Sequence, residues 1–144
     1  MKKILGFLLV FTVILFAACS KDDNSSGGAS AAVSTSLKQG TWRVTSYVDN
    51  GTDETSDFNG FNFTFNAGGT VNASNTAFTV AGTWSTGVDD SKHKLVLNFN
   101  TSSFSFFGEI SEDWEIVTQS TTQISLKHVS GGSGQTDLLV FTKN

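Results

Sequence analysis

Two groups of carboxylate side chains are the first candidates for chemistry in this chain of 144 residues. The first group consists of Glu109, Glu112, Asp113 and Glu115, with Trp114 among them. A pair of carboxylates placed across a sugar can serve as acid and base in glycoside hydrolysis. The alternative is that these charges lie on the outer face of a strand and in the loop before it. We favour the alternative, which predicts a solvated surface here.

The second group lies in one short stretch and consists of Asp49, Asp53, Glu54 and Asp57. Hard oxygen ligands at such density could hold Ca²⁺. Their spacing, however, matches no calcium-binding loop that we recognise. We therefore favour a solvated acidic turn between two strands.

Histidine, cysteine and serine residues add little catalytic potential. His93 and His128 are far apart in the sequence, and neither has a cysteine or a closely spaced carboxylate beside it, so we expect no metal site. Serines are abundant, but no Gly-x-Ser-x-Gly motif places one as a nucleophile. We expect a protein that is not an enzyme and that carries no cofactor.

The segment from Thr101 to Glu112 is rich in large apolar residues, although it lies between two expected strands. These residues are Phe104, Phe106, Phe107 and Ile110. Apolar side chains in a loop either pack against the domain or meet a partner. We expect a short helix or a lid that covers one end of the fold.

Residues 1–18 have the layout of a secretory signal peptide. Lys2 and Lys3 precede an apolar run from Ile4 to Phe16, and small residues close the run. The run has 13 residues, whereas a membrane-spanning helix needs about 20. We expect residues 1–18 to be removed from the mature protein.

The expected cleavage site, Phe16-Ala17-Ala18-Cys19, resembles the lipobox of bacterial lipoproteins. The resemblance implies that the Cys19 thiol receives a diacylglycerol and that Cys19 becomes the mature N-terminus. Each acyl methylene buried in the bilayer contributes about 0.8 kcal/mol, so two or three chains hold a protein stably. The alternative is a plain signal peptide followed by a chance cysteine.

The residues after Cys19 carry a second resemblance. Lys21-Asp22-Asp23 resembles the surface-export signal of Bacteroidetes lipoproteins, and Ser20 resembles residues that sort lipoproteins to the outer membrane. These resemblances imply a lipid-anchored protein of the cell outer membrane, displayed at the surface. The alternative is that residues 21–23 merely begin a linker.

The remaining chain divides into a tether, residues 19–36, and a folded domain, residues 37–144. Gly/Ser-rich stretches such as the one after Asn24 behave as flexible coil. Removal of the signal peptide takes away two of the 9 basic residues and none of the 13 acidic ones, which leaves a net charge of −6. With Arg43 as the single arginine, we expect no nucleic-acid partner. Cys19 is the one cysteine, so the domain has no internal disulfide.

The folded domain is predicted to be all-β. From Leu37 onward, apolar and polar residues alternate, turn residues recur at short intervals, and proline is absent. We expect eight strands, at residues 41–49, 60–66, 70–75, 77–85, 92–100, 113–118, 123–129 and 137–142. Turns are expected at residues 50–51, 67–69, 87–90 and 130–134. Eight antiparallel strands in a meander commonly protect their edges by closing into a barrel.

The alternation also assigns one face of each strand to the interior. The expected interior residues are Trp42, Val44, Val48, Phe61, Phe63, Phe65, Val80, Trp84, Leu95, Leu97, Phe99, Trp114, Ile116, Ile124, Leu126, Leu138 and Val140. The sequence holds 13 phenylalanines and 3 tryptophans, and aromatic side chains bury more area than any other type. They either fill the core, which we favour, or line a ligand cavity.

Gly40-Thr41-Trp42, at the start of the first expected strand, resembles the Gly-x-Trp signature of lipocalins. Residues 37–144 as a whole resemble the lipocalin-like domains of Bacteroidetes lipoproteins. The resemblance implies an eight-stranded up-and-down barrel in which Trp42 closes one end and the opposite mouth admits a ligand. Lipocalins usually place an arginine of the last strand over this tryptophan, and the last strand here offers Lys143 instead.

We expect a membrane-anchored lipoprotein whose barrel binds a small apolar or amphipathic molecule. The alternative is a protein-interaction module, an accessory subunit or an inhibitor, that uses a filled barrel as a rigid scaffold. The candidate barrel-end or ligand-pocket residues are Trp42, Phe61, Phe63, Phe65, Trp84, Phe99 and Trp114.

Overall fold

The computed structural model describes residues 28–144. The predicted signal peptide, Cys19 and residues 21–23 lie outside the described residues. Within the described part, no helix is both long and apolar enough to span a membrane. The elements are α1 (Gly28–Leu37), β1 (Trp42–Asp49), β2 (Thr52–Asp53), η1 (Thr55–Phe58), β3 (Asn62–Phe65), β4 (Thr70–Ser74), β5 (Thr79–Asp89), β6 (Lys92–Phe99), η2 (Ser105–Gly108), β7 (Asp113–Gln119), β8 (Gln123–Val129) and β9 (Thr136–Lys143).

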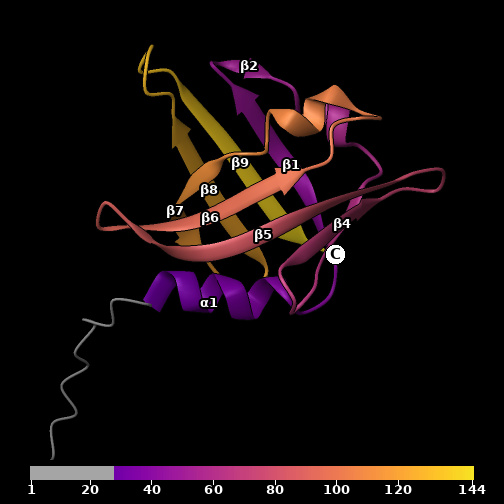
Figure 1. The fold of residues 1–144 in the computed structure, drawn as a ribbon, viewed down its shortest axis with the longest axis horizontal. Coiled ribbons are helices and arrows are strands. Elements are labelled where there is room, and N and C mark those ends of the chain that lie inside the picture. The colour runs from indigo at the N-terminus through magenta and orange to yellow at the C-terminus, as the bar shows by residue number, and fades with distance from the viewer. Residues whose placement is uncertain (1–27) are drawn as a thin grey trace, which may run out of the picture.

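The strands form a closed antiparallel barrel of eight strands, as the sequence predicts (Figure 1). Each strand from β3 to β9 pairs with its neighbour in the chain, and β1 closes the ring by pairing with both β3 and β9. The two-residue strand β2 adds a short hairpin to β1. Its turn is made by Asn50 and Gly51, which have φ values of 46° and 86°. Glycine and asparagine tolerate this left-handed conformation, as the Asn-Gly pair predicts.

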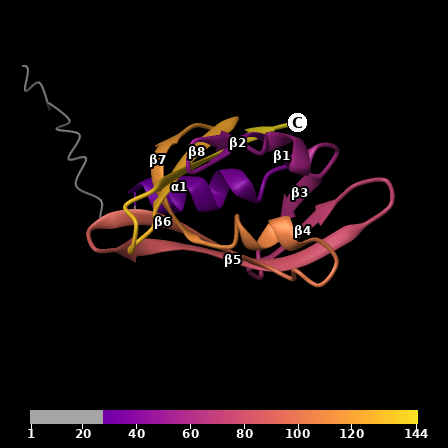
Figure 2. The same ribbon diagram turned by 90° about the horizontal axis from the view of Figure 1, so that it is seen from above.

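The predicted tether, residues 19–36, is corrected at its C-terminal half, because Gly28–Leu37 forms the helix α1. Val33 and Leu37 are fully buried, and their spacing of four residues places them on one face of the helix. The small residues around them, mostly serine and alanine, gave no amphipathic signal strong enough to distinguish a helix from a linker. In Figure 1, α1 lies at one end of the barrel. Figure 2 shows it crossing between the β7–β8 side and the β5–β6 side.

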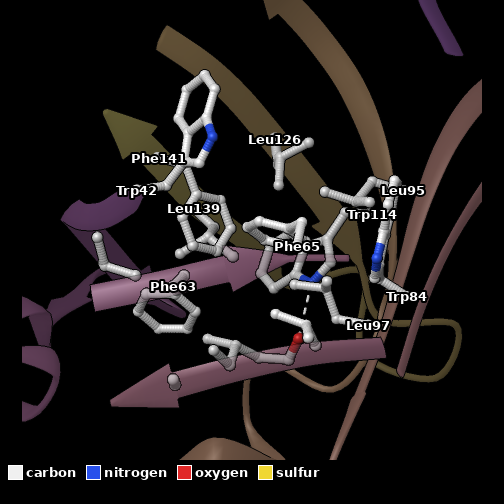
Figure 3. Close-up of a cluster of buried hydrophobic side chains, with 14 of the residues drawn as sticks. Trp42, Phe63, Phe65, Trp84, Leu95, Leu97, Trp114, Leu126, Leu139 and Phe141 are labelled. Carbon is white, nitrogen blue, oxygen red and sulfur yellow. Dashed lines mark hydrogen bonds between the residues drawn. The ribbon is translucent and has the colours of Figure 1, made fainter. Parts of the chain in front are cut away.

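One core of aromatic and aliphatic side chains fills the barrel (Figure 3). Its largest fully buried members are Trp42, Trp114, Tyr47, Phe58, Phe63, Phe107 and Phe141. Many of the rings meet edge to face, which is the arrangement that their quadrupoles favour. Phe63 meets Phe141 in this way with ring centroids 5.2 Å apart, and Phe65 meets Trp84 at 5.5 Å.

Two of the predicted interior faces are wrong. A bulge between Val44 and Ser46 shifts the register of β1, so that Tyr47 and not Val48 points into the core. In β9, Leu139 and Phe141 are fully buried, whereas Leu138 is 44% exposed. Both faces of β9 are apolar, so alternation alone could not select the inner one.

Candidate functional site

The end of the barrel next to α1 is closed by contacts that Trp42 makes with Leu37 and Lys143. The indole N–H of Trp42 donates to the carbonyl of Leu37 at 3.2 Å, and Nζ of Lys143 lies 5.8 Å from the centre of the indole ring. Gly40 has φ of 80°, and a Cβ atom there would lie 3.1 Å from Cε of Lys143. The glycine and the tryptophan of the Gly-x-Trp motif therefore both serve packing at this end, with Lys143 placed over the tryptophan as a cation.

His93 also makes a structural contact at this end of the barrel. Its Nδ1 lies 2.9 Å from Oγ of Ser30, and the same hydroxyl group donates to the carbonyl of Gly87 at 2.6 Å. These contacts fasten the first turn of α1 to the β5–β6 hairpin. His93 is thus half-buried in a structural contact and is not an isolated surface residue.

All seven residues predicted to line a barrel end or pocket lie in the core, each no more than 7% exposed. Their polar atoms have partners within the chain. Trp84 donates its indole N–H to the carbonyl of Asn66 at 3.1 Å, and Trp114 donates to that of Ile110 at 3.0 Å. Among the described residues, no buried side-chain nitrogen or oxygen lacks a hydrogen-bond partner. Ligand pockets usually present a few convergent polar groups, and this interior presents none that is free.

The opposite end is covered by the loop between β6 and β7, which confirms the predicted lid. Phe107 and Ile110 of this loop are fully buried, and Phe107 meets Phe58, Phe61 and Phe99 at centroid distances of 5.6, 5.2 and 5.0 Å. The η2 turn supplies the local structure that brings these rings inward. We call the surface of this end the rim; it comprises the β4–β5, β6–β7 and β8–β9 loops together with β2 and η1.

One half of the rim is aromatic. Phe78, in the β4–β5 loop, is 55% exposed, and its ring meets Phe104 edge to face at 5.1 Å. Phe104 in turn meets Phe61 of the core at 5.8 Å. A shallow depression of about 140 Å³ lies nearby, lined by Thr79, Val80, Ala81, Asn100, Ser102 and Ser103. Ligand pockets usually enclose about 300–1,000 Å³, so this depression suits no more than a small group.

The other half of the rim is acidic and brings together members of both carboxylate groups of the sequence. Partial desolvation, a hydrogen bond with Glu54 and the charges of Glu54, Asp49 and Asp57 raise the pKa of Glu109 to about 7. Desolvation and a hydrogen bond with Asp137 raise the pKa of Asp49.

Tyr47 lies beneath the acidic half, and its hydroxyl group donates to the carbonyl of Glu109 at 3.4 Å. Burial and the surrounding carboxylates raise the pKa of this tyrosine well above its usual range.

Two of the carboxylates behave as the surface interpretation predicts. Glu115 lies on the outer wall of the barrel, 2.8 Å from Nζ of Lys92 and 3.6 Å from Nζ of Lys127. Its ion pair with Lys92 lowers its pKa. The hydroxyl and backbone N–H groups of Thr55 lower the pKa of Asp53. Neither group is held as a catalytic acid or base.

His128 corrects the expectation that it has no carboxylate near it. Its Nε2 lies 3.7 Å from Oε2 of Glu112 and 3.7 Å from Oδ1 of Asp113. Its Nδ1 lies 3.4 Å from Oδ2 of Asp137, and its ring packs on Trp114 at 5.9 Å. Sequence spacing could not reveal this group, because its members come from three adjacent strands and from the loop before β7. The pairing of β8 with β9, which sets His128 opposite Asp137, is the signal that would have found it.

Comparison with known proteins supports the fold alone. No protein-family model matches the chain, and no curated protein matches it significantly. Among solved structures, the chain is similar to the crystal structure of a DUF4847 family protein from Bacteroides vulgatus ATCC 8482. The two share 20% sequence identity with a TM-score of 0.51, over 78% of this chain and 97% of that one. At this identity the likeness shows a common barrel and carries no function to this chain.

Proposed function

We propose that this chain is a lipid-anchored outer-membrane protein whose lipocalin-like barrel is a rigid, non-catalytic interaction module. The observation that carries the proposal is the filled interior. Phe63 and Phe107 are 0% exposed, and both ends of the barrel are covered, one by α1 and one by the β6–β7 loop. A barrel packed in this way has no room for an enclosed ligand, but it holds its loops in fixed positions, which lowers the entropic cost of binding.

The rim is the surface that we assign to the partner. Single exposed apolar residues are common, but Phe78 belongs to a continuous series of rings that runs through Phe104 to Phe61 in the core. A ring held from below loses little conformational freedom when a partner covers it. Aromatic anchors of this kind are enriched in protein interfaces.

The charge of the rim narrows the chemistry of the partner. Asp49, Glu54, Glu109 and Asp137 lie beside the aromatic half, and the mature chain is expected to carry a net charge of −6. We infer a protein partner that presents lysine or arginine beside apolar side chains. Complementary charge would speed the encounter, and the aromatic anchor would hold the complex.

Site-specific photo-crosslinking on intact cells tests this proposal. A photoreactive amino acid placed at Phe78 should yield one recurring crosslinked protein. The same group at Thr121, an exposed residue in the β7–β8 turn at the α1 end, is the matched control and should not yield it. Equal crosslinking from both positions, or none from Phe78, would refute the proposal.

Native mass spectrometry tests the alternative function, binding of a small apolar or amphipathic molecule inside the barrel. The detergent-solubilised protein is incubated with a lipid and metabolite extract and then weighed. We expect the mass of the protein alone. Repeated recovery of one small adduct would show that the barrel binds a small molecule.

A further inference from the structure

We propose that His128, Glu112 and Asp113 form a binding site for a divalent transition-metal ion such as Zn²⁺. The site lies on the acidic half of the rim, and it stands independently of the proposed protein partner. One potential ligand atom of each residue lies within 4.8 Å of the others. Imidazole nitrogen with carboxylate oxygen is a donor set that Zn²⁺ accepts, whereas Ca²⁺ prefers oxygen alone.

The distances to His128 suit one shared ion. Nε2 lies 3.7 Å from an oxygen of Glu112 and 3.7 Å from an oxygen of Asp113. Two ligand atoms that each bind an ion at about 2.1 Å can be at most about 4.2 Å apart. A separation of 3.7 Å therefore corresponds to an angle of about 120° at the ion. The two carboxylate oxygens lie within 4.8 Å of each other and must come within about 4.2 Å to share the ion. Both side chains are partly exposed, which leaves them room to move.

The His128 ring is oriented for metal binding by contacts on the side away from the two carboxylates. Asp137 faces Nδ1 at 3.4 Å, and Trp114 packs against the ring, so Nε2 is aimed at the two carboxylates. A carboxylate that accepts the Nδ1 proton fixes the tautomer whose Nε2 carries a lone pair. A cation placed between Nε2 and the two carboxylate oxygens would attract all three of these atoms. The arrangement of a metal, a histidine and an outer carboxylate is a common one in metal sites.

The supporting backbone is rigid. The carbonyl of Glu112 accepts the N–H of Leu97 at 3.0 Å, and His128 lies in the β8–β9 ladder. Asp113 uses Oδ2 to bind Nζ of Lys94 at 3.2 Å, which leaves Oδ1 for the ion. The Glu112 and Asp113 side chains are 44% and 50% exposed, so an ion can enter from solvent and water can complete its coordination.

Titration of the tag-free full chain in detergent with Zn²⁺, followed by calorimetry, tests the site. We expect one ion per chain. Glu112→Gln should weaken binding at least tenfold, because it removes a ligand charge without changing the side-chain shape. The matched control is Glu115→Gln, which removes the same charge three residues further along the chain, on the outer wall of β7, and should change the affinity less than twofold. Asp137→Asn should weaken binding about tenfold through the orientation of His128.

Nuclear magnetic resonance gives a second readout on the same samples. Zn²⁺ should shift the ring signals of His128 and leave those of His93, at the other end of the barrel, unchanged. Absence of binding at millimolar Zn²⁺ would overturn the proposal. So would equal weakening by Glu112→Gln and Glu115→Gln, which would mean that diffuse negative charge attracts the ion.

Discussion

Replacement of Phe63 by alanine measures how well the barrel interior is filled. The Phe63 side chain is 0% exposed, and its ring lies 5.9 Å from that of Phe99, 6.1 Å from that of Phe107 and 5.2 Å from that of Phe141. Those rings are held by their own neighbours, so they cannot collapse fully into the space that the substitution opens. Buried Phe→Ala substitutions cost about 3–5 kcal/mol. We expect about 4 kcal/mol for Phe63→Ala.

The matched control is Phe78→Ala, the same chemical change at a residue that is 55% exposed. It removes one edge-to-face contact, with Phe104, and should cost about 1 kcal/mol. Urea unfolding followed by tryptophan fluorescence gives both values, provided that the dependence of the unfolding free energy on urea concentration is unchanged. A difference of less than about 1 kcal/mol between the two variants would refute a tightly packed interior.

The same pair of variants tests whether the interior is dry and closed. A cavity left by Phe63→Ala is lined by apolar rings, and such cavities bind small apolar molecules. Benzene should therefore raise the melting temperature of Phe63→Ala but leave those of the wild type and Phe78→Ala unchanged. Equal stabilisation of the wild type would mean that a cavity already exists.

Further expectations concern the strand pairing, the anchor and the rim. Gly82→Ala would place a Cβ atom 2.6 Å from the backbone oxygen of the facing strand, so it should cost about 3 kcal/mol or more in urea unfolding, whereas Gly87→Ala on the same strand meets nothing within 4 Å and should be neutral. Cys19→Ser should abolish incorporation of labelled palmitate and release the protein from membranes. Alanine at residues 21–23 should leave the protein anchored but protected from added protease. Because the pKa of Glu109 is raised, the folded state binds the proton of this carboxyl group more tightly than the unfolded state does. The protonated carboxyl group therefore contributes its full stabilisation below pH 4.5, and this contribution is lost as the pH rises through about 7. Glu109→Gln should remove this part of the pH dependence of the unfolding free energy.

The strands were predictable because their sequence signals are local. Alternation and turn residues located all eight strands of the barrel to within a few residues, and Asn50-Gly51 forms the turn expected of it. Prediction failed where the outcome depends on contacts between elements that are distant in the sequence. Leu138 and Leu139 are the same residue type on opposite faces of β9, and only the pairing with β1 and β8 determines which one is buried. α1 was missed because its burial depends on the barrel end that it covers.

The candidate sites also divide into features with a local sequence signal and features that depend on contacts between distant segments. That Trp42 closes a barrel end could be expected from the Gly-x-Trp motif, and Trp42 indeed lies at the covered end beside α1. The approach of His128 to Glu112 could not be expected, because 16 positions of sequence span two strands and a turn and the contact exists only once β7 and β8 pair. Likewise, the raised pKa of Glu109 depends on Glu54, which reaches it across the rim from another loop.

The attachment of α1 has a mechanical consequence. The chain enters the described domain at Gly28, so a pull applied through the N-terminus loads α1 before it loads any strand. The contacts that resist this pull include the two bonds of Ser30, the packing of Ala29, Val33 and Leu37 against the core, and the bond from Trp42 to Leu37. In the barrel behind them every strand pairs with both of its neighbours, through long ladders at most positions and through the single pair Trp42 and Phe63 between β1 and β3. Under tension α1 would therefore detach first and lengthen the chain, and the rim would keep its shape while the load is absorbed.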